Sequence, residues 1–531
     1  MIGTRLLLGA ITALGIATAL AHIPLGAQAP ATLTVAWNAA RTALDPNEAS
    51  TFLTAAAAYE GAFLIHDGLV RLSEQMTILP ELATSWNVAQ DGRTWRFTIR
   101  RGVSFHDGAP LTTRAIAEAL QREVDAKTNP SNRPLWDPIV SSSAPDESTV
   151  QIVTREPYAA LLHVLAHGSG LIGKPAVQET AGTQPRYPVE GTGPYRLARW
   201  EAGTQLELVR NSSYWGGRPG FDRIVLRVVA DPAIRAAMIR GGQAQVADGI
   251  PPEQASGLER VPGTTVTIKP SLRTFGMAIN MSRPFLQDIR VRHALNYAVN
   301  KELIVNALFQ GHASVLRSPL APQASGYVDL GPWPYDPPRA RRLLEEAGWK
   351  PAPPIGVRVR DGKSLELTLL TPLGTFPRDV EVTETLADYL RNVGFGIHFA
   401  YVDPAGLGDQ LLVAPDQSRW ELAFFGFDPV DGDGGLHLDA LYRTNTDQKR
   451  RPLVRNIAWY ANPRVDAWLS EGGRTIDPRQ RADTYAKAAR QVWNDAPYLW
   501  LYAEDVIVAT RNVRGVEIQP TGVTILRSAH P

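Results

Sequence analysis

The sequence predicts a mixed α/β fold with more than one lobe. The chain has 531 residues and a mass of 58.0 kDa, which is more than one hydrophobic core usually supports. Short segments of alternating polarity and amphipathic segments follow one another along the chain, with no repeat of fixed period. Hydrophobic residues make up 44% of the chain and charged residues 20%, which favours a folded globular protein over a disordered chain or a polytopic membrane protein.

The first 29 residues predict a secretory signal peptide. Arg5 precedes an apolar run over residues 6–20, and small residues follow at 27–29. The run is shorter than the roughly 20 residues that a membrane span needs, although an uncleaved N-terminal anchor is the alternative. The chain has no cysteine, which excludes disulfides, thiol chemistry and the lipid-bearing cysteine of a lipoprotein.

The segment 94–100 predicts a half-buried strand, because apolar and polar residues alternate along it. Its apolar face would carry Trp95, Phe97 and Ile99. The turn-forming pairs Asp91-Gly92 and Asp107-Gly108 flank the segment. We therefore expect antiparallel strands joined by tight turns between residues 91 and 110.

An aspartate followed by a proline predicts the start of three helices, since aspartate caps the first N–H groups and proline fits the first helical position. The pairs are Asp231-Pro232, Asp336-Pro337 and Asp477-Pro478. A fourth helix is expected after Asp288. Apolar residues at helical spacing predict that three of these helices face a core. These residues are Val291, Ala294, Leu295, Ala298 and Val299 after Asp288; Ala340, Leu343, Leu344 and Ala347 after Pro337, with Gly348 as the helix stop; and Ala482, Tyr485, Ala486, Ala489, Val492 and Trp493 after Pro478.

No catalytic or cofactor motif is complete in the sequence. The segment 168–174 has the glycines of a phosphate-binding loop, but Pro175 stands where that loop needs a hydroxyl. His163 and His167 have the spacing of a zinc-protease pair, but Val164 replaces the glutamate. No serine lies in a nucleophile elbow. We therefore expect no enzymatic activity, no cofactor and no metal site.

Two further features exclude other kinds of partner. The segment 428–435 reads Asp-Pro-Val-Asp-Gly-Asp-Gly-Gly, but Tyr442 stands where a calcium loop beginning at Asp431 needs its closing glutamate. We expect a flexible Gly/Asp turn there, with a carboxylate cluster as the alternative. The 54 basic and 53 acidic residues give a net charge of +1, which offers no basic field for nucleic acid.

Several motifs occur in a fixed order between residues 81 and 498. They are ELATSW at 81–86, DGRTWRFTIRRGVSFHDGAPLT at 91–112, GTGPY at 191–195, RNSSYW at 210–215, Asn280 with RPF at 283–285, DIRVRHALNYAVNK at 288–301, ARRLL at 340–344 with AGW at 347–349, and Tyr485 with Pro497-Tyr498. Together they resemble the extracytoplasmic solute-binding proteins of peptide and nickel ABC importers, solute-binding protein family 5.

The resemblance implies a three-lobed periplasmic binding protein type II (Venus-flytrap) architecture with mixed sheets. Lobe I would comprise residues 30–67, 191–272 and 499–531, lobe II residues 68–190, and lobe III residues 273–498. A ligand would lie between lobes I and III, and closure around it would shift the population toward the closed state. The implied protein is a periplasmic monomer that delivers its ligand to the membrane permease of an ABC importer.

The resemblance also implies candidate ligand contacts, with a short peptide as the expected ligand. Peptide-binding relatives hold the ligand's α-amino group with an aspartate shortly after a Gly-Trp pair. Here the pair is Gly426-Phe427, so Asp428 is the first candidate and Asp431 the second. Four aromatic residues are candidates for side-chain pockets, with core packing as the alternative for each; they are Trp420, Phe425, Phe427 and Tyr401. Arg273 is the candidate partner of a ligand carboxylate.

The sequence leaves three other functions open. In the first, the same scaffold binds a nickel chelate or another small polar solute. A secreted hydrolase and a receptor or scaffold protein in signalling are the others, and the hydrolase lacks any visible nucleophile and base.

Overall fold

The computed structural model describes residues 31–37, 60–125, 133–174, 190–201, 203–352, 356–427, 429, 432–445 and 456–531. The predicted signal peptide and the two candidate aspartates, Asp428 and Asp431, lie outside these residues. Helices and mixed sheets alternate along the chain, so the predicted α/β class is confirmed. Within the described ranges, no helix has both the length and the apolar character that crossing a bilayer requires.

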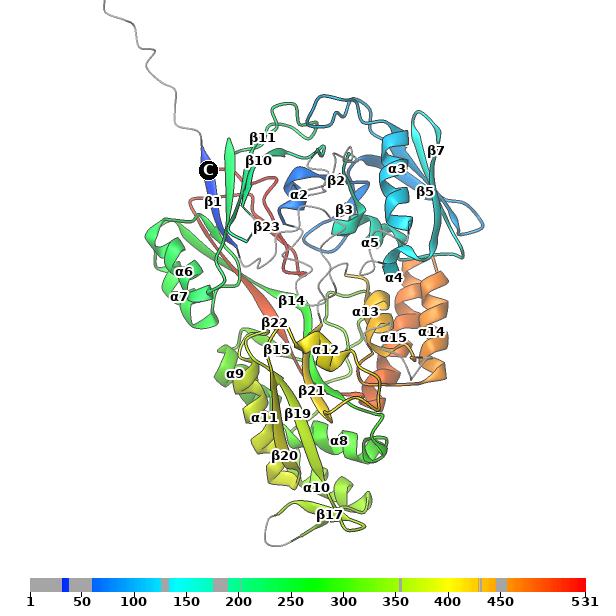
Figure 1. Ribbon diagram of the computed structural model, residues 1–531, viewed down its shortest axis with the longest axis vertical. Helices are drawn as coiled ribbons and strands as arrows, with labels where there is room; N and C mark the ends of the chain where they lie inside the picture. The colour runs from blue at the N-terminus through cyan, green and yellow to red at the C-terminus, as the bar shows by residue number, and fades with distance from the viewer. Residues whose placement is uncertain are drawn as a thin grey trace, which may run out of the picture.

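An 11-stranded mixed sheet runs through the length of the molecule (Figure 1). Its strands, in spatial order, are β10 (Tyr195–Glu201), β11 (Gln205–Arg210), β12 (Arg223–Val228), β1 (Thr32–Trp37), β13 (Val246–Ala247), β22 (Tyr498–Arg511), β14 (Thr264–Ile279), β21 (Leu422–Phe427), β19 (Glu366–Pro372) and β20 (Gly396–Val402), with β15 (Ala313–Val315) beside β22. The long strands β14 and β22 cross the middle of the molecule. We call the described residues of 31–270 and 505–531 the upper part, and those of 274–503 the lower part.

A second sheet in the upper part confirms the predicted strand. It has four antiparallel strands, β5 (Ala83–Val88), β6 (Thr94–Ile99), β8 (Thr149–Thr154) and β7 (Ile139–Asp146), covered by α3 (Thr113–Val124). The three predicted apolar side chains of β6 are all buried. Asp91 forms the predicted turn by accepting hydrogen bonds from the N–H groups of Arg93 and Thr94.

The four predicted helix starts are confirmed, since each aspartate accepts a backbone hydrogen bond in the first turn. The helices are α6 (Pro232–Gly241), α8 (Ile289–Ala298), α10 (Pro337–Glu346) and α15 (Pro478–Asp495). Helix α10 ends as predicted, because Ala347 is its C-cap and Gly348 follows with a φ of +87°, the left-handed conformation that favours glycine. One detail differs from the prediction. Helix α15 buries Arg481 and Ala488 more deeply than the predicted Ala482 and Ala486.

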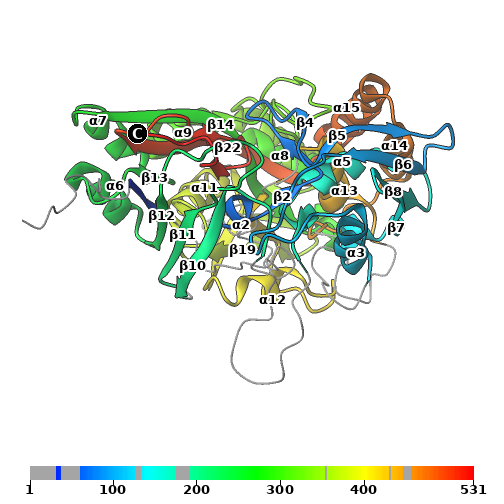
Figure 2. The ribbon, with the colours of Figure 1, turned by 90° about the horizontal axis from the view of Figure 1, so that it is seen from above.

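The remaining helices cover the sheets from both parts. In the upper part they are α2 (Ala62–Ile65), α4 (Arg133–Trp136), α5 (Leu161–Ala166) and α7 (Pro252–Glu259); in the lower part they are α9 (Lys301–Phe309), α11 (Asp379–Val393), α12 (Leu407–Leu411), α13 (Gly434–Tyr442) and α14 (Pro463–Arg474). Figure 2 shows α14 and α15 at the same end of the molecule as the four-stranded sheet, with α6 and α7 at the opposite end.

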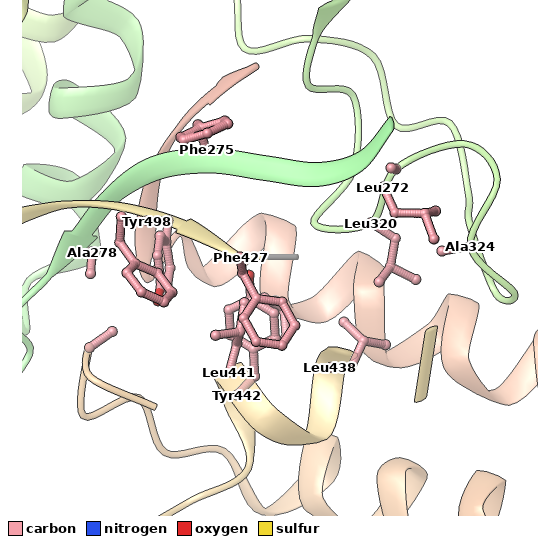
Figure 3. Packing of buried hydrophobic residues seen from close by; sticks show 14 of the residues in the cluster. Leu272, Phe275, Ala278, Leu320, Ala324, Phe427, Leu438, Leu441, Tyr442 and Tyr498 are labelled. Carbon is pink, nitrogen blue, oxygen red and sulfur yellow. The ribbon is translucent and has the colours of Figure 1, made fainter. Parts of the chain in front are cut away.

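The core of the lower part is built on the central strands. Phe275 of β14 stacks on Tyr502 of β22, with ring centroids 5.1 Å apart, and on Phe424 of β21 at 5.7 Å. Figure 3 shows Phe275 on one face of these strands and Phe427 of β21 on the other, where Phe427 lies beside Leu441 and Tyr442 of α13. Burying each of these rings contributes about 1.5–3 kcal/mol, so the central strands anchor the whole part.

A buried ionic cluster joins distant segments of the upper part. Arg527 forms an ion pair with Glu81, and its Nη1 lies 3.7 Å from Oδ1 of Asp67. Gly68 donates its N–H to Glu81 at 2.8 Å. Asp67 also accepts hydrogen bonds from three side chains, those of Thr192 (2.9 Å), Trp215 (2.8 Å) and Tyr214 (3.3 Å). One guanidinium therefore faces two buried carboxylates.

The cluster should make stability depend on the protonation of Glu81. Burial raises the pKa of Glu81 to about 7, with Asp67 adding to the rise and Arg527 opposing it. Between pH 4.5 and 7 the folded state therefore binds more protons at Glu81 than the unfolded state, so stability falls as the pH rises. We expect the melting temperature of the wild type to fall relative to that of Glu81→Gln across this window and to level off above it. Parallel pH profiles of the two proteins would contradict this expectation.

Candidate functional site

The parallel strands of the two parts have carboxyl ends that face each other across the middle of the molecule. In the upper part β1 is parallel to β12 and β13. The carboxyl end of β13, Ala247, pairs with Ala509 of β22. In the lower part β19 is parallel to β20 and β21, and the end of β21, Phe427, faces Thr274 of β14. Both sets of carboxyl ends therefore point toward the middle of β14 and β22. Ligands of α/β proteins bind at such ends.

The pairing of β14 with β22 is irregular at this level. Residues 271–273 of β14 lie opposite the single residue Glu504, and a second shift follows between Phe275 and Gly276. Such bulges bend and twist a strand. Arg273 lies in the first bulge, and its Nη1 is 2.8 Å from Oε1 of Glu504. The two long strands that join the parts thus change direction at the candidate site.

The loop after β19 is held by one buried carboxylate. Asp379, at the start of α11, accepts hydrogen bonds from the N–H groups of Gly374, Thr375 and Phe376, at 2.9–3.2 Å. The N–H of Val380 donates to the same side chain. This arrangement fixes the loop that follows the carboxyl end of β19.

The structure places the candidate aromatic residues at different depths. Phe425 and Phe427 are buried on β21, and Phe427 lies at its carboxyl end. Trp420 is buried before the start of β21, where its Nε1 donates to the carbonyl of Gln410. Tyr401, near the end of β20, is 49% exposed and stacks on Phe399 with ring centroids 5.5 Å apart. The candidate site therefore gathers Arg273 and Phe427, while Trp420 lies away from it; their roles in binding stay predictions.

Helix α13 begins at Gly434, within the segment for which the sequence predicted a flexible turn. Asp433 caps α13 by accepting hydrogen bonds from the N–H groups of Gly435 (2.7 Å) and Leu436 (3.2 Å). Gly434 donates its N–H to Oγ of Ser325 at 3.0 Å. The predicted turn is wrong for Gly434 and Gly435, because both belong to the first turn of α13.

Two buried polar residues near this helix were missed by the sequence analysis. His437 of α13 packs edge-on against Phe427, with ring centroids 4.8 Å apart, and burial lowers its pKa to about 3. Arg481 of α15 lies 3.5 Å from Oδ2 of Asp433 and donates to the carbonyl of Ala159 in the upper part. The burial of Arg481 could have been predicted from its helical spacing to Tyr485. Nothing in the sequence indicated the burial of His437.

Backbone contacts also cross from one part to the other at this level. Ala159 donates its N–H to the carbonyl of Gly473 in α14 at 2.9 Å. A Cβ on Gly432 would lie 2.5 Å from the methyl group of Met76, so the lower part packs closely on the upper part there. The parts are therefore in contact around the candidate site.

The two histidines with zinc-protease spacing lie at the end of α5. His163 lies in α5 and His167 follows that helix, and the His167 ring bonds to the hydroxyl of Ser169 at 2.9 Å. In the part of the chain that the structure describes, no three histidine or acidic side chains cluster as metal ligands.

Comparisons with known proteins agree with this geometry. Residues 77–449 match the model of the bacterial extracellular solute-binding proteins, family 5 Middle. The glutathione-binding protein GsiB of Escherichia coli K12 is 30% identical over 513 residues, which are 96% of each chain. The structure of NikA from Brucella suis in complex with Fe(III)-EDTA superimposes with a TM-score of 0.81 at 24% identity, covering 94% of this chain and 99% of that one. The structure of DppA from Helicobacter pylori in complex with the peptide STSA gives a TM-score of 0.76 at 21% identity, covering 94% and 98%.

These matches confirm the resemblance drawn from the sequence motifs, including the periplasmic binding protein architecture. The model match spans most of the chain, and the similarity to GsiB extends over nearly all of it. The chain belongs to family 5 of the bacterial extracellular solute-binding proteins.

Proposed function

We propose that this protein is the periplasmic substrate-binding component of an ABC importer, and that it delivers short peptides to a membrane permease. The similarity to GsiB over 96% of both chains carries the proposal. Glutathione is a tripeptide, so a peptide ligand agrees with the name of that relative. In this proposal the protein is a monomer that binds its ligand without a cofactor and without chemical turnover.

In the proposed mechanism, lobes I and III close over the peptide with the boundaries predicted from the sequence. The boundary between residues 272 and 273 lies inside the first bulge of β14, where a bend would separate the two parts. An extended peptide offers backbone donors and acceptors at strand spacing, which gives affinity without a requirement for particular side chains.

The charged ends of the peptide would set its register. Asp428, or Asp431 in its place, would hold the α-amino group next to the end of β21. Arg273 would bind the terminal carboxylate of the peptide, which would replace Glu504 as its ion-pair partner. Phe427 and Tyr401 would contact side chains of the peptide.

Calorimetry with a small set of ligands tests the proposal. We expect trialanine and glutathione to bind, with a change in the fluorescence of the 13 tryptophans. N-acetyl-trialanine should bind more weakly because it lacks the charged amine. Binding of nickel with free histidine, without binding of any peptide, would replace the peptide with a metal chelate as the ligand.

The two candidate aspartates can be separated by substitution. We expect either Asp428→Asn or Asp431→Asn to weaken trialanine binding about tenfold or more, the effect of losing a hydrogen bond to a charged group. The same variant should leave the affinity for N-acetyl-trialanine unchanged. Asp416→Asn, at an exposed position before β21, is the matched control. Equal trialanine affinities in all three variants would show that neither Asp428 nor Asp431 binds the α-amino group of the peptide.

A further inference from the structure

Two exposed ion pairs join the upper part to the lower part. Glu253, in the first turn of α7, has Oε2 3.2 Å from Nη2 of Arg378, the residue before α11. Glu156, before α5, has Oε2 2.6 Å from Nη2 of Arg474, the last residue of α14. In both pairs the acid belongs to the upper part and the arginine to the lower part. Figures 1 and 2 place α7 and α14 on opposite flanks of the molecule.

Arg378 is held in position and has a second partner within the lower part. Its φ of +55° is unusual for a side chain other than glycine, and Asp379 fixes the loop that precedes it. Nη1 of Arg378 lies 3.7 Å from Oε1 of Glu381, one turn further along α11. When the parts separate, Arg378 keeps Glu381 as a partner and loses only Glu253.

We propose that these two ion pairs, Glu253–Arg378 and Glu156–Arg474, are electrostatic clamps that hold the parts together around the ligand and so set its affinity without touching it. The inference rests on the proposed function, in which closure and ligand binding are coupled. An interaction that forms only in the closed state raises ligand affinity by up to its whole free energy, and the gain is largest when the free protein is mostly open. All four side chains are partly exposed, so salt screens the clamps and each is individually weak.

Neutralising the acids tests the clamps through affinity. We expect Glu253→Gln and Glu156→Gln each to weaken the binding of glutathione, used as the probe, by about two- to fivefold, the range of an exposed ion pair. The double variant should multiply the two effects, because the sites lie on opposite flanks. Its affinity should also depend less on salt than that of the wild type. In a double-mutant cycle, Glu253→Gln should have no further effect once Arg378→Gln is present.

Glu118→Gln is the matched control for these variants. Glu118 is an exposed acid of the upper part, and it pairs at 2.8 Å with Arg114 of the same helix. Glu118→Gln removes one ion pair and one charge but leaves the contacts between the two parts intact. The affinity for glutathione should therefore equal that of the wild type within error. An equal loss in Glu118→Gln would assign the effect to net charge and overturn the clamps.

A distance measurement tests the clamps without any ligand. The chain has no cysteine, so Gln243→Cys after α6 and Asn306→Cys in α9, both exposed, give one unique pair of sites for spin labels. We expect the Glu156→Gln, Glu253→Gln double variant to shift the distance distribution toward longer values at low salt, and the wild type to do the same at high salt. An unchanged distribution together with an unchanged affinity for glutathione would overturn the clamps. Failure of the wild type to bind any peptide would instead overturn the proposed function, since the distances are measured without ligand.

Discussion

Replacing Arg527 with methionine should lower the free energy of unfolding by about 3–5 kcal/mol, the usual effect of removing one partner from a buried ion pair. Above pH 7, where Glu81 is ionised, Arg527 neutralises it and also lies close to Asp67, and both carboxylates are almost fully buried. Methionine fills much of the same volume but leaves the two acids without a cation. The midpoint of urea unfolding should therefore fall, with a similar slope.

A matched substitution separates this effect from the loss of an arginine in general. Arg114 is exposed on α3 and pairs only with Glu118 among the ion pairs that the structure describes. Arg114→Met should change the free energy of unfolding by no more than about 0.5 kcal/mol. Adding Glu81→Met to Arg527→Met should recover part of the loss, because a buried apolar pair replaces the charges. Equal midpoints for Arg527→Met and Arg114→Met would show that the cluster does not stabilise the fold.

Local structure was predictable from the sequence because its causes are local. The alternation around Trp95 and the aspartate caps at Asp231 and Asp477 each depend on a few neighbouring residues, and the structure confirms them. The buried face of α15 differs from the predicted one because the prediction counted only apolar residues as core and so left out Arg481. Arg481 is buried with an ion pair to Asp433 and a hydrogen bond to the carbonyl of Ala159, and both partners come from other elements.

The ionic cluster could not be predicted for a similar reason. Asp67 and Arg527 are separated by almost the whole chain, and no spacing rule links them. The motif at 191–195 marked the family but gave no sign that Thr192 binds Asp67. Among the candidate ligand contacts, aromatic character identified Phe427 at the end of β21 and also Trp420, which is buried elsewhere. Residue type alone does not distinguish a ring at a site from a ring in a core.

Gly434→Ala should cost about 2–3 kcal/mol of stability and weaken ligand binding as well. A Cβ at Gly434 would lie 1.8 Å from the carbonyl oxygen of Ser325, which is a backbone atom and cannot rotate away. Helix α13 and the loop at Ser325 must therefore move apart, at the upper end of the usual cost of overpacking. The start of α13 follows the candidate aspartates in the sequence, so we expect its displacement to weaken the binding of trialanine as well.

Gly473→Ala is the matched control, because a Cβ at that position in α14 meets nothing within 4 Å. Alanine favours a helix over glycine by up to about 1 kcal/mol, so this variant should be as stable as the wild type or more so, with unchanged affinity for trialanine. Urea unfolding and calorimetry on both variants separate the two positions. If Gly434→Ala unfolds at a lower urea concentration but binds trialanine like the wild type, the start of α13 supports the lower part without positioning the ligand.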